Sequence, residues 1–136
     1  MRPARKAHLK LGRRGEDVAW NLPESKGCEL IARNWRVKSG ELDIVVLDGE
    51  TLVFVEVKTL RKKGAFRPMD NLSMVQIKRN ARAAGSYWKS LGQPELATRF
   101  DLIEVVLSRW GVCDIRHHCG YQPPLAEYRS SFSWEL

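Results

Sequence analysis

Residues 40–58 decide the fold and read Gly-Glu-Leu-Asp-Ile-Val-Val-Leu-Asp-Gly-Glu-Thr-Leu-Val-Phe-Val-Glu-Val-Lys. Two apolar, β-branched runs flank Asp48-Gly49, a dipeptide that suits the central positions of a two-residue hairpin turn. The stretch therefore predicts a β-hairpin in which Leu47 pairs with Glu50. In that register, Glu41 lies opposite Glu56 at the open end of the hairpin.

Side chains alternate along each strand, so the hairpin has two faces of different character. One face is apolar throughout and consists of Leu42, Ile44, Val46, Val53, Val55 and Val57. The other face is apolar near the turn and ends in Glu41, Asp43, Glu56 and Lys58. Like charges placed this close destabilise a sheet unless something offsets their repulsion. A divalent cation offsets it, since Mg²⁺ prefers carboxylate oxygens and water.

A solvated hairpin end, with Lys58 as the counter-ion of the carboxylates, is the simpler alternative. The fully apolar opposite face indicates, however, that the hairpin is covered on that side and that its charged end faces a cleft. We therefore expect Asp43 and Glu56 to bind a divalent cation.

The same hairpin resembles a known nuclease signature. Asp43, followed after a short hairpin by Glu56-Val57-Lys58, is similar to the Asp…Glu-x-Lys signature of restriction-endonuclease-like nucleases. Residues 9–118 resemble the bacterial YraN-type family, which is itself similar to archaeal Holliday-junction resolvases. The blocks that carry this resemblance are Gly15-Glu16, Arg33-Asn34-Trp35, Gly40-Glu41-Leu42-Asp43, Phe54-Val55-Glu56-Val57-Lys58-Thr59 and Arg99-Phe100-Asp101.

This resemblance implies a metal-dependent site. Asp43 and Glu56 would hold one or two Mg²⁺ (or Mn²⁺) ions, with Glu16 as a third ligand directly or through water. Lys58 would orient or help deprotonate the attacking water and stabilise the charge on the phosphate. Glu41 would assist from beside these ligands. Gln76 would assist as a helical glutamine does in some relatives of this fold, whereas the family more often has a basic residue at that position. On residue chemistry alone, Glu16 suits equally a first-turn helix position, where a negative charge favours the helix dipole.

The net charge indicates the kind of partner. Lys and Arg number 23 against 16 Asp and Glu, which gives +7 at pH 7. A basic protein favours nucleic acid because neutralised phosphates release counterions, and we expect DNA. The expected contacts are Arg13, Arg14, Arg61, Lys62, Lys63 and Arg67. Two alternatives remain: the positive charge serves solubility, or the basic loop after Lys58 is simply solvated. The sequence does not decide whether the protein forms a homodimer.

Composition argues against several classes of protein. A hydrophobic content of 43% in 136 residues fits one globular domain with its own core. The apolar runs are far too short for a membrane span, so no membrane partner is expected. The basic N-terminus lacks the apolar stretch of a signal peptide, and Arg13-Arg14 runs into Gly-Glu-Asp rather than a twin-arginine signal. Three cysteines without framework spacing suit reduced thiols, so we expect a cytoplasmic protein.

Hydrophobic periodicity predicts the remaining elements. These are a helix over 9–25, a strand over 28–36, a helix over 74–91 capped by Asn71 or Ser73, a strand over 99–107 and an edge strand over 112–117. Asp101 interrupts the apolar strand and needs a partner, which Arg99 or Lys58 can supply.

The order helix, three strands, helix, two strands predicts an α/β fold with a mixed central sheet of about five strands flanked by helices. This is also the restriction-endonuclease-like core that the resemblance implies. We expect one nuclease-like domain over residues 1–120, with a basic arm at 1–8 and a C-terminal extension at 121–136. A zinc site is not predicted, because the spacing of Cys113, His117, His118 and Cys119 matches no paired-ligand pattern.

Two classes of function follow. The first is a metal-dependent endonuclease that hydrolyses phosphodiester bonds in DNA, with branched or repair intermediates among the candidate substrates. The second is a nucleic-acid-binding accessory protein that keeps this fold without useful turnover. The presence of Asp43, Glu56 and Lys58 together favours the nuclease.

Overall fold

A computed structural model of the chain describes residues 15–38, 40–61 and 73–128. The strands are β1 (Glu29–Val37), β2 (Gly40–Asp48), β3 (Thr51–Arg61), β4 (Ala97–Ser108) and β5 (Gly111–Gln122). The helices are an N-terminal helix described over residues 15–25, α2 (Met74–Ser90) and the short 3-10 helix η1 (Leu125–Tyr128). This order confirms the predicted α/β class.

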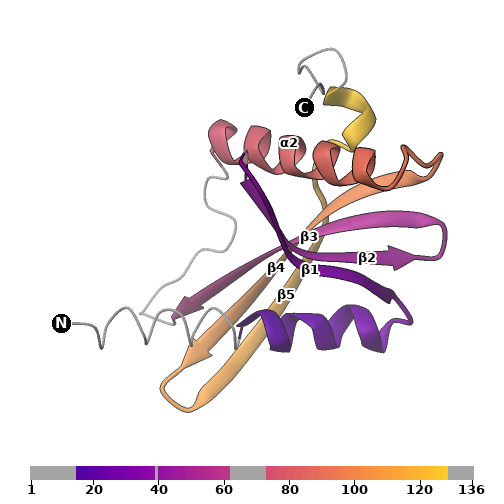
Figure 1. Ribbon diagram of the computed structural model, residues 1–136. Helices are drawn as coiled ribbons and strands as arrows, with labels where there is room; N and C mark the ends of the chain where they lie inside the picture. Colours follow the sequence, from indigo (N-terminus) through magenta and orange to yellow (C-terminus); the bar gives the residue numbers. More distant parts are fainter. Residues whose placement is uncertain (1–14, 39, 62–72, 129–136) are drawn as a thin grey trace.

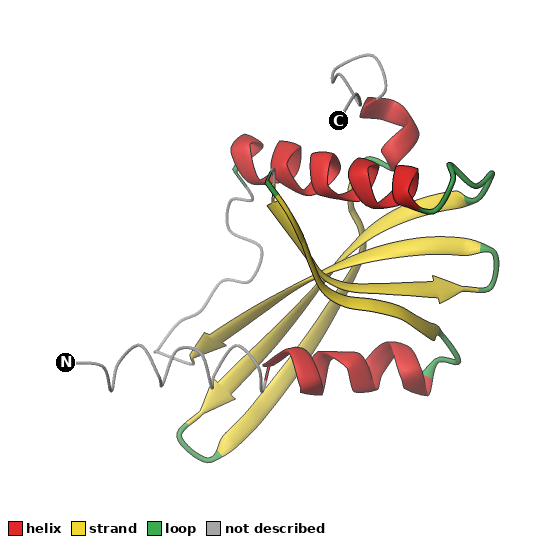
Figure 2. Ribbon diagram, in the orientation of Figure 1, coloured by secondary structure: helices red, strands yellow, loops and turns green. Residues whose placement is uncertain are grey.

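One sheet joins all five strands in the order β1-β2-β3-β4-β5. β3 and β4 run parallel, whereas the other neighbours are antiparallel. A parallel pair needs a crossover connection, and α2 lies within it. α2 covers one face of the sheet and the N-terminal helix covers the other, so the domain has three layers (Figures 1 and 2).

α2 forms where its apolar stripe predicts it. Ser73 caps its start, because the Ser73 hydroxyl oxygen accepts a hydrogen bond from the Gln76 backbone N–H at 3.1 Å. Its buried side consists of small residues and Tyr87, which pack on Phe54 and Phe100 of the sheet. Alanine at these positions lets the helix lie close to the strands. Among the described residues, those buried in this layer are Leu42, Val45, Leu52, Phe54, Ala81, Ala83, Ala84, Tyr87, Phe100, Leu125 and Tyr128.

The N-terminal helix packs on the opposite face through Ala19 and Val18. The sheet residues beneath it are Ile44, Val46, Val53, Val55, Ile103, Val105 and Leu107. Gly15 is buried at the start of the described helix, and a Cβ there would collide with the Thr59 hydroxyl of β3. The absent side chain therefore lets the helix approach β3 directly beside Glu16.

The central hairpin forms, but the predicted register is wrong. Leu47 pairs with Leu52 instead of Glu50, and Asp48 pairs with Thr51, so the turn consists of Gly49-Glu50. Gly49 takes a φ of 61°, a left-handed conformation that suits glycine. A shift of two residues keeps every side chain on its face, which is why the apolar pattern could not distinguish the two registers.

The open end of the hairpin also differs from the prediction. Glu41 does not lie opposite Glu56, and it forms an ion pair with Arg36 of β1 at 3.0 Å. Leu42 packs in the layer beneath α2 rather than beside Ile44, so alternation breaks between these two residues. The break marks the point where β2 leaves β3.

The C-terminal part of the described chain belongs to the core. β5 continues to Gln122, and Leu125 and Tyr128 of η1 are buried in the same core cluster as the inner side of α2. Among the helices of the described residues, none has the length and apolar character needed to cross a membrane.

Gly15→Ala should destabilise the protein by about 1–3 kcal/mol, the scale of overpacking, although alanine normally favours a helix. The cause would be the Thr59 hydroxyl, so the same substitution in a Thr59→Ala background should cost clearly less. Urea denaturation of the four proteins measures this coupling. Equal stability of wild type and Gly15→Ala would contradict the close approach.

Candidate active site

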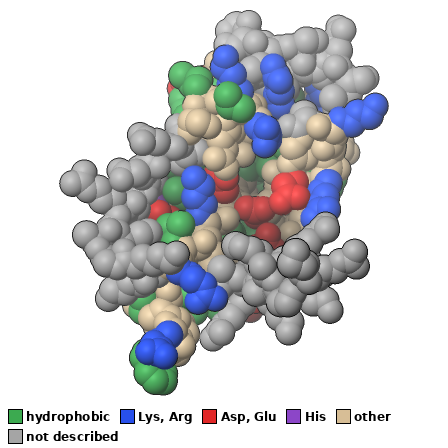
Figure 3. All heavy atoms as spheres, turned by 90° about the vertical axis from the view of Figure 1, so that its left-hand side faces the viewer, with side chains coloured by type: hydrophobic (Ala, Val, Ile, Leu, Met, Phe, Trp, Pro, Cys, Tyr) green, Lys and Arg blue, Asp and Glu red, His purple; other side chains and the backbone are tan. Residues whose placement is uncertain are grey.

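A cleft of about 820 Å³ opens where β2 separates from β3. Glu41, Asp43 and Glu56 line it from the two strands, and α2 and Tyr121 of β5 line its other side. Figure 3 shows acidic side chains gathered in a hollow at the middle of this face, with Lys and Arg side chains around them. The predicted carboxylates of the hairpin thus share one cleft.

Three uncharged donors hold the carboxylate of Glu56. The Gln76 side-chain amide donates to Oε1, and the Asn80 side-chain amide donates to Oε2 at 3.0 Å. The Tyr121 hydroxyl also donates to Oε2, at 3.1 Å, while it accepts from Asn80 at 2.8 Å. Burial, together with the Glu56 charge, raises the pKa of Tyr121 and keeps it a donor. These contacts orient Glu56 without neutralising its charge.

The sequence predicted Gln76 near the site but not Asn80 or Tyr121. Gln76 and Asn80 are four residues apart, so they lie on the same side of α2. That polar pair on a helix was a signal that could have been used. Tyr121 fell in the predicted C-terminal extension, and only the continuation of β5 brings it to Glu56.

Asp43 lies half-buried among other carboxylates. Its Oδ2 accepts the backbone N–H of Val57 at 2.8 Å. Burial above all raises the pKa of Asp43 to about 7; the Val57 N–H opposes this shift, and the charges of Glu16, Glu56 and Glu41 add to it. Asp43 therefore carries negative charge that nearby groups disfavour, which a cation would stabilise.

Glu16 approaches Asp43 from the N-terminal helix. Burial raises the pKa of Glu16, whereas the Arg33 charge lowers it. Asn34 takes a positive φ of 53°, which asparagine tolerates better than most residues. With its amide turned so that nitrogen faces Glu16, Asn34 donates to both carboxylate oxygens at 3.2 and 3.0 Å. Glu16 acts on Asp43 through its charge, although it is not among the residues that line the cleft.

Lys58 follows Glu56 by two residues along β3 and is half-buried. Among the described residues that line the cleft are Glu56 and Val57, but not Lys58. Its neighbour across the parallel pair is the buried Glu104 of β4. The structure thus brings Glu41, Asp43, Glu56 and Gln76 to one cleft, sets Glu16 close by, and leaves Lys58 beside it.

Basic residues form the rim of the cleft. They are Arg36, Lys38, Arg79 and Arg82. Gly40 permits the close approach of Arg79, since a Cβ on Gly40 would lie 2.8 Å from Arg79 Cγ. The sequence did not predict this rim. Of the predicted nucleic-acid contacts, Arg61 is exposed at the end of β3, while Arg13, Arg14, Lys62, Lys63 and Arg67 lie outside the described residues.

Comparison with known proteins identifies a family. The model of the uncharacterised protein family UPF0102 matches residues 15–105 of the 136. The chain belongs to this family. The match includes the central hairpin and the Glu16 and Asp101 blocks, and it confirms the family-level resemblance of the sequence.

Curated relatives extend the match over most of the chain. A UPF0102 protein of Streptomyces griseus is 42% identical over 112 residues, which cover 81% of this chain and 93% of that protein. UPF0102 protein CT2262 of Chlorobaculum tepidum is 41% identical over 96 residues, covering 71% and 74%. A UPF0102 protein of Nitratidesulfovibrio vulgaris is 41% identical over 106 residues, covering 78% of each. These relatives establish kinship, and the function has to be argued from the site.

Asp43→Asn should change how stability depends on pH. The folded protein binds the Asp43 proton more tightly than the unfolded chain does, so this group favours folding below about pH 4 and loses that contribution as the pH rises through about 7. In EDTA at pH 8, the free energy of unfolding of Asp43→Asn should therefore be about 1–3 kcal/mol larger than that of the wild type. Near pH 4 the two proteins should be equally stable.

Urea denaturation at the two pH values measures this difference. The control is Glu24→Gln, which changes an exposed carboxylate on the N-terminal helix. Mg²⁺ should stabilise the wild type at pH 8 and leave Asp43→Asn unchanged. A stability difference that is the same at both pH values would mean that the ionised Asp43 carries no cost.

Proposed function

We propose that this protein is a metal-dependent endonuclease that hydrolyses phosphodiester bonds in DNA. The observation that carries the proposal is the pair Asp43 and Glu56 in a cleft with a basic rim, with the charge of Glu16 close to Asp43. The carboxylates of Glu41, Asp43 and Glu56, which form the acidic floor of the cleft, suit a divalent cation. The basic rim suits the phosphates on either side of the bond to be cut. The resemblance to Holliday-junction resolvases favours branched or repair intermediates as substrates.

The residues present fit Mg²⁺ or Mn²⁺. Asp43 and Glu56 offer hard oxygen ligands, and Glu16 offers a third directly or through water. Burial first, and the neighbouring carboxylates second, raise the pKa of Asp43 to about 7, so a cation would stabilise its ionised form. When bound, the ion would polarise a phosphoryl oxygen and lower the pKa of a coordinated water.

The protein's own groups would orient and bind. Gln76, Asn80 and Tyr121 fix the carboxylate of Glu56, as hydrogen-bonded neighbours do for metal ligands. Arg36 holds Glu41 in an ion pair at the rim. From its position two residues beyond Glu56, Lys58 would orient the attacking water and stabilise charge on the phosphate.

A second candidate is a nucleic-acid-binding accessory protein with little or no turnover. Two observations favour it: both oxygens of Glu56 already accept hydrogen bonds, and Lys58 is not among the described lining residues. In that case, the rim would bind nucleic acid, while the carboxylates would be a remnant of the scaffold. A cleavage assay distinguishes the two.

Purified protein should cut plasmid or branched DNA with Mn²⁺ and not with EDTA, and RNA serves as the comparison substrate. Asp43→Asn and Glu56→Gln should abolish cleavage. Lys58→Ala should lower the cleavage rate by a factor of about 10²–10³, which is the effect of removing one preorganised donor. The matched control is Lys89→Ala, near the end of α2.

Each alternative has its own result. Tight DNA binding without cleavage of any substrate would identify the accessory protein. A Lys58→Ala protein that cleaves at the wild-type rate but melts at a lower temperature would make Lys58 a structural counter-ion.

Arg79→Gln should weaken DNA binding similarly for all sequences, because a phosphate contact carries no base information. The dependence of log Kd on log salt should become shallower by about one unit, the contribution of one phosphate contact. Fluorescence anisotropy in EDTA measures both effects, with Lys89→Gln as the control. An unchanged salt slope would remove Arg79 from the interface.

A further inference from the structure

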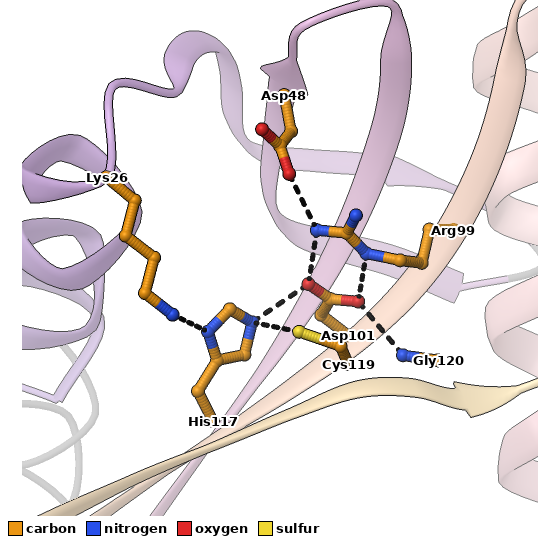
Figure 4. Close-up of polar contacts among 7 residues, drawn as sticks. All are labelled: Lys26, Asp48, Arg99, Asp101, His117, Cys119 and Gly120. Carbon is orange, nitrogen blue, oxygen red and sulfur yellow. Dashed lines mark hydrogen bonds and ion pairs between the residues drawn. The ribbon is translucent and has the colours of Figure 1, made fainter.

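A second cluster of chemically reactive side chains lies on the other face of the sheet, on the side of the N-terminal helix. It consists of Asp101 on β4 and of His117 and Cys119 on β5. One ligand atom from each residue lies within 4.8 Å of the other two. Figure 4 shows the three side chains converging, with Lys26 and Arg99 on either side.

The spacing along the chain did not predict this cluster. His118 belongs to the opposite face, where its Nε2 lies 2.6 Å from a carboxylate oxygen of Glu104. His117 and Cys119 are two residues apart in β5 and share a face. The third member comes from the neighbouring strand, because Asp101 pairs with Cys119 in the sheet register.

The distances are close to those of a tetrahedral zinc site. Cys119 Sγ lies 3.6 Å from His117 Nε2. Bond lengths of about 2.3 Å to sulfur and 2.0–2.1 Å to nitrogen place two such ligands about 3.6 Å apart at the tetrahedral angle. His117 Nε2 lies 2.8 Å from Asp101 Oδ2, about 0.5 Å less than two such ligands around zinc require. Binding of the ion would therefore require the imidazole to move away from Asp101 by about that distance.

We propose that Asp101, His117 and Cys119 bind Zn²⁺ through Oδ2, Nε2 and Sγ. Imidazole, thiolate and carboxylate are all zinc ligands, and the two anions balance the charge of the ion. Asp101 is 1% exposed and fixes the inner end of the site, whereas Cys119 is exposed, which leaves the fourth position to water.

Binding exchanges protons for the metal. Lys26 Nζ lies 3.0 Å from His117 Nδ1, and since a lysine ammonium can only donate, Nδ1 accepts and Nε2 carries the proton. Zn²⁺ takes the place of that proton on Nε2, the imidazole then carries its proton on Nδ1, and Lys26 moves away. The Cys119 thiol releases its proton to solvent, so one proton leaves per ion bound.

Arg99 supports the site and also limits its affinity. Its guanidinium donates to Asp101 at 2.8 and 3.0 Å, and Gly120 N–H adds a bond at 3.1 Å, so Asp101 is fixed in place. Asp48 lies 3.2 Å from Arg99 and offsets part of its charge. In the zinc-bound state, Lys26 would no longer contact His117 and would only add a positive charge near the ion. Its removal should therefore tighten binding.

The test is Zn²⁺ affinity measured by competition with a chromophoric chelator, in excess Mg²⁺ so that the acidic cleft is occupied. The wild type should bind one ion per chain. Cys119→Ser and His117→Gln should each weaken binding at least about tenfold, and Lys26→Ala should strengthen it. Cys113→Ser is the matched control, because Cys113 is also exposed on β5 and lies outside the cluster.

Co²⁺ provides a second readout that does not depend on enzymatic activity. The wild type and Asp43→Asn should both show thiolate-to-cobalt charge transfer in the near-ultraviolet, and Cys119→Ser should lack it. Absence of Zn²⁺ binding at neutral pH would overturn the proposal. So would binding that survives Cys119→Ser but is lost in Asp43→Asn, because the ion would then lie in the acidic cleft.

Discussion

The hydrogen bond from the Val57 N–H to the Asp43 carboxylate is the constraint on which the site depends. Pairing between β2 and β3 ends at Ile44 and Val55, and a partly buried N–H beyond that point needs another acceptor. Asp43 supplies it, so the strands can separate without leaving the Val57 N–H unpaired. Leu42 then packs beneath α2, and the cleft opens in the space between the strands.

The use of Asp43 as the acceptor for Val57 places a carboxylate in a partly buried position beside other carboxylates, where its negative charge is disfavoured. Asp43 gains a backbone donor, but burial and the charges of Glu16 and Glu56 still raise its pKa to about 7. The groups around Glu56 are uncharged amides and a phenol, which orient a carboxylate without balancing its charge. Protonation or a bound cation can balance it, and only the cation does so above neutral pH.

Sequence patterns predicted the sheet and both helices, and they narrowed the cap of α2 to Asn71 or Ser73, of which the structure uses Ser73. Apolar periodicity and capping act over a few residues, which is why the sequence alone indicates them. They did not predict the hairpin register, since a shift of two residues leaves both faces unchanged. Asn34 was missed because its role depends on a positive φ and on a helix far away in the chain. Tyr121 and the cluster around Asp101 were missed for a related reason: each needs a partner strand that only the folded sheet specifies. The roles of Lys58 and Glu16 remain predictions from the resemblance.

The position of a bound ion tests the central claim most directly. Crystals grown with Mn²⁺ and measured at its absorption edge would locate the ion by anomalous scattering. We predict a peak within about 2.0–2.6 Å of carboxylate oxygens of both Asp43 and Glu56, with at least one of the amide contacts to Glu56 released. A cleft without such a peak at saturating Mn²⁺, with Gln76, Asn80 and Tyr121 still bonded to Glu56, would contradict the account.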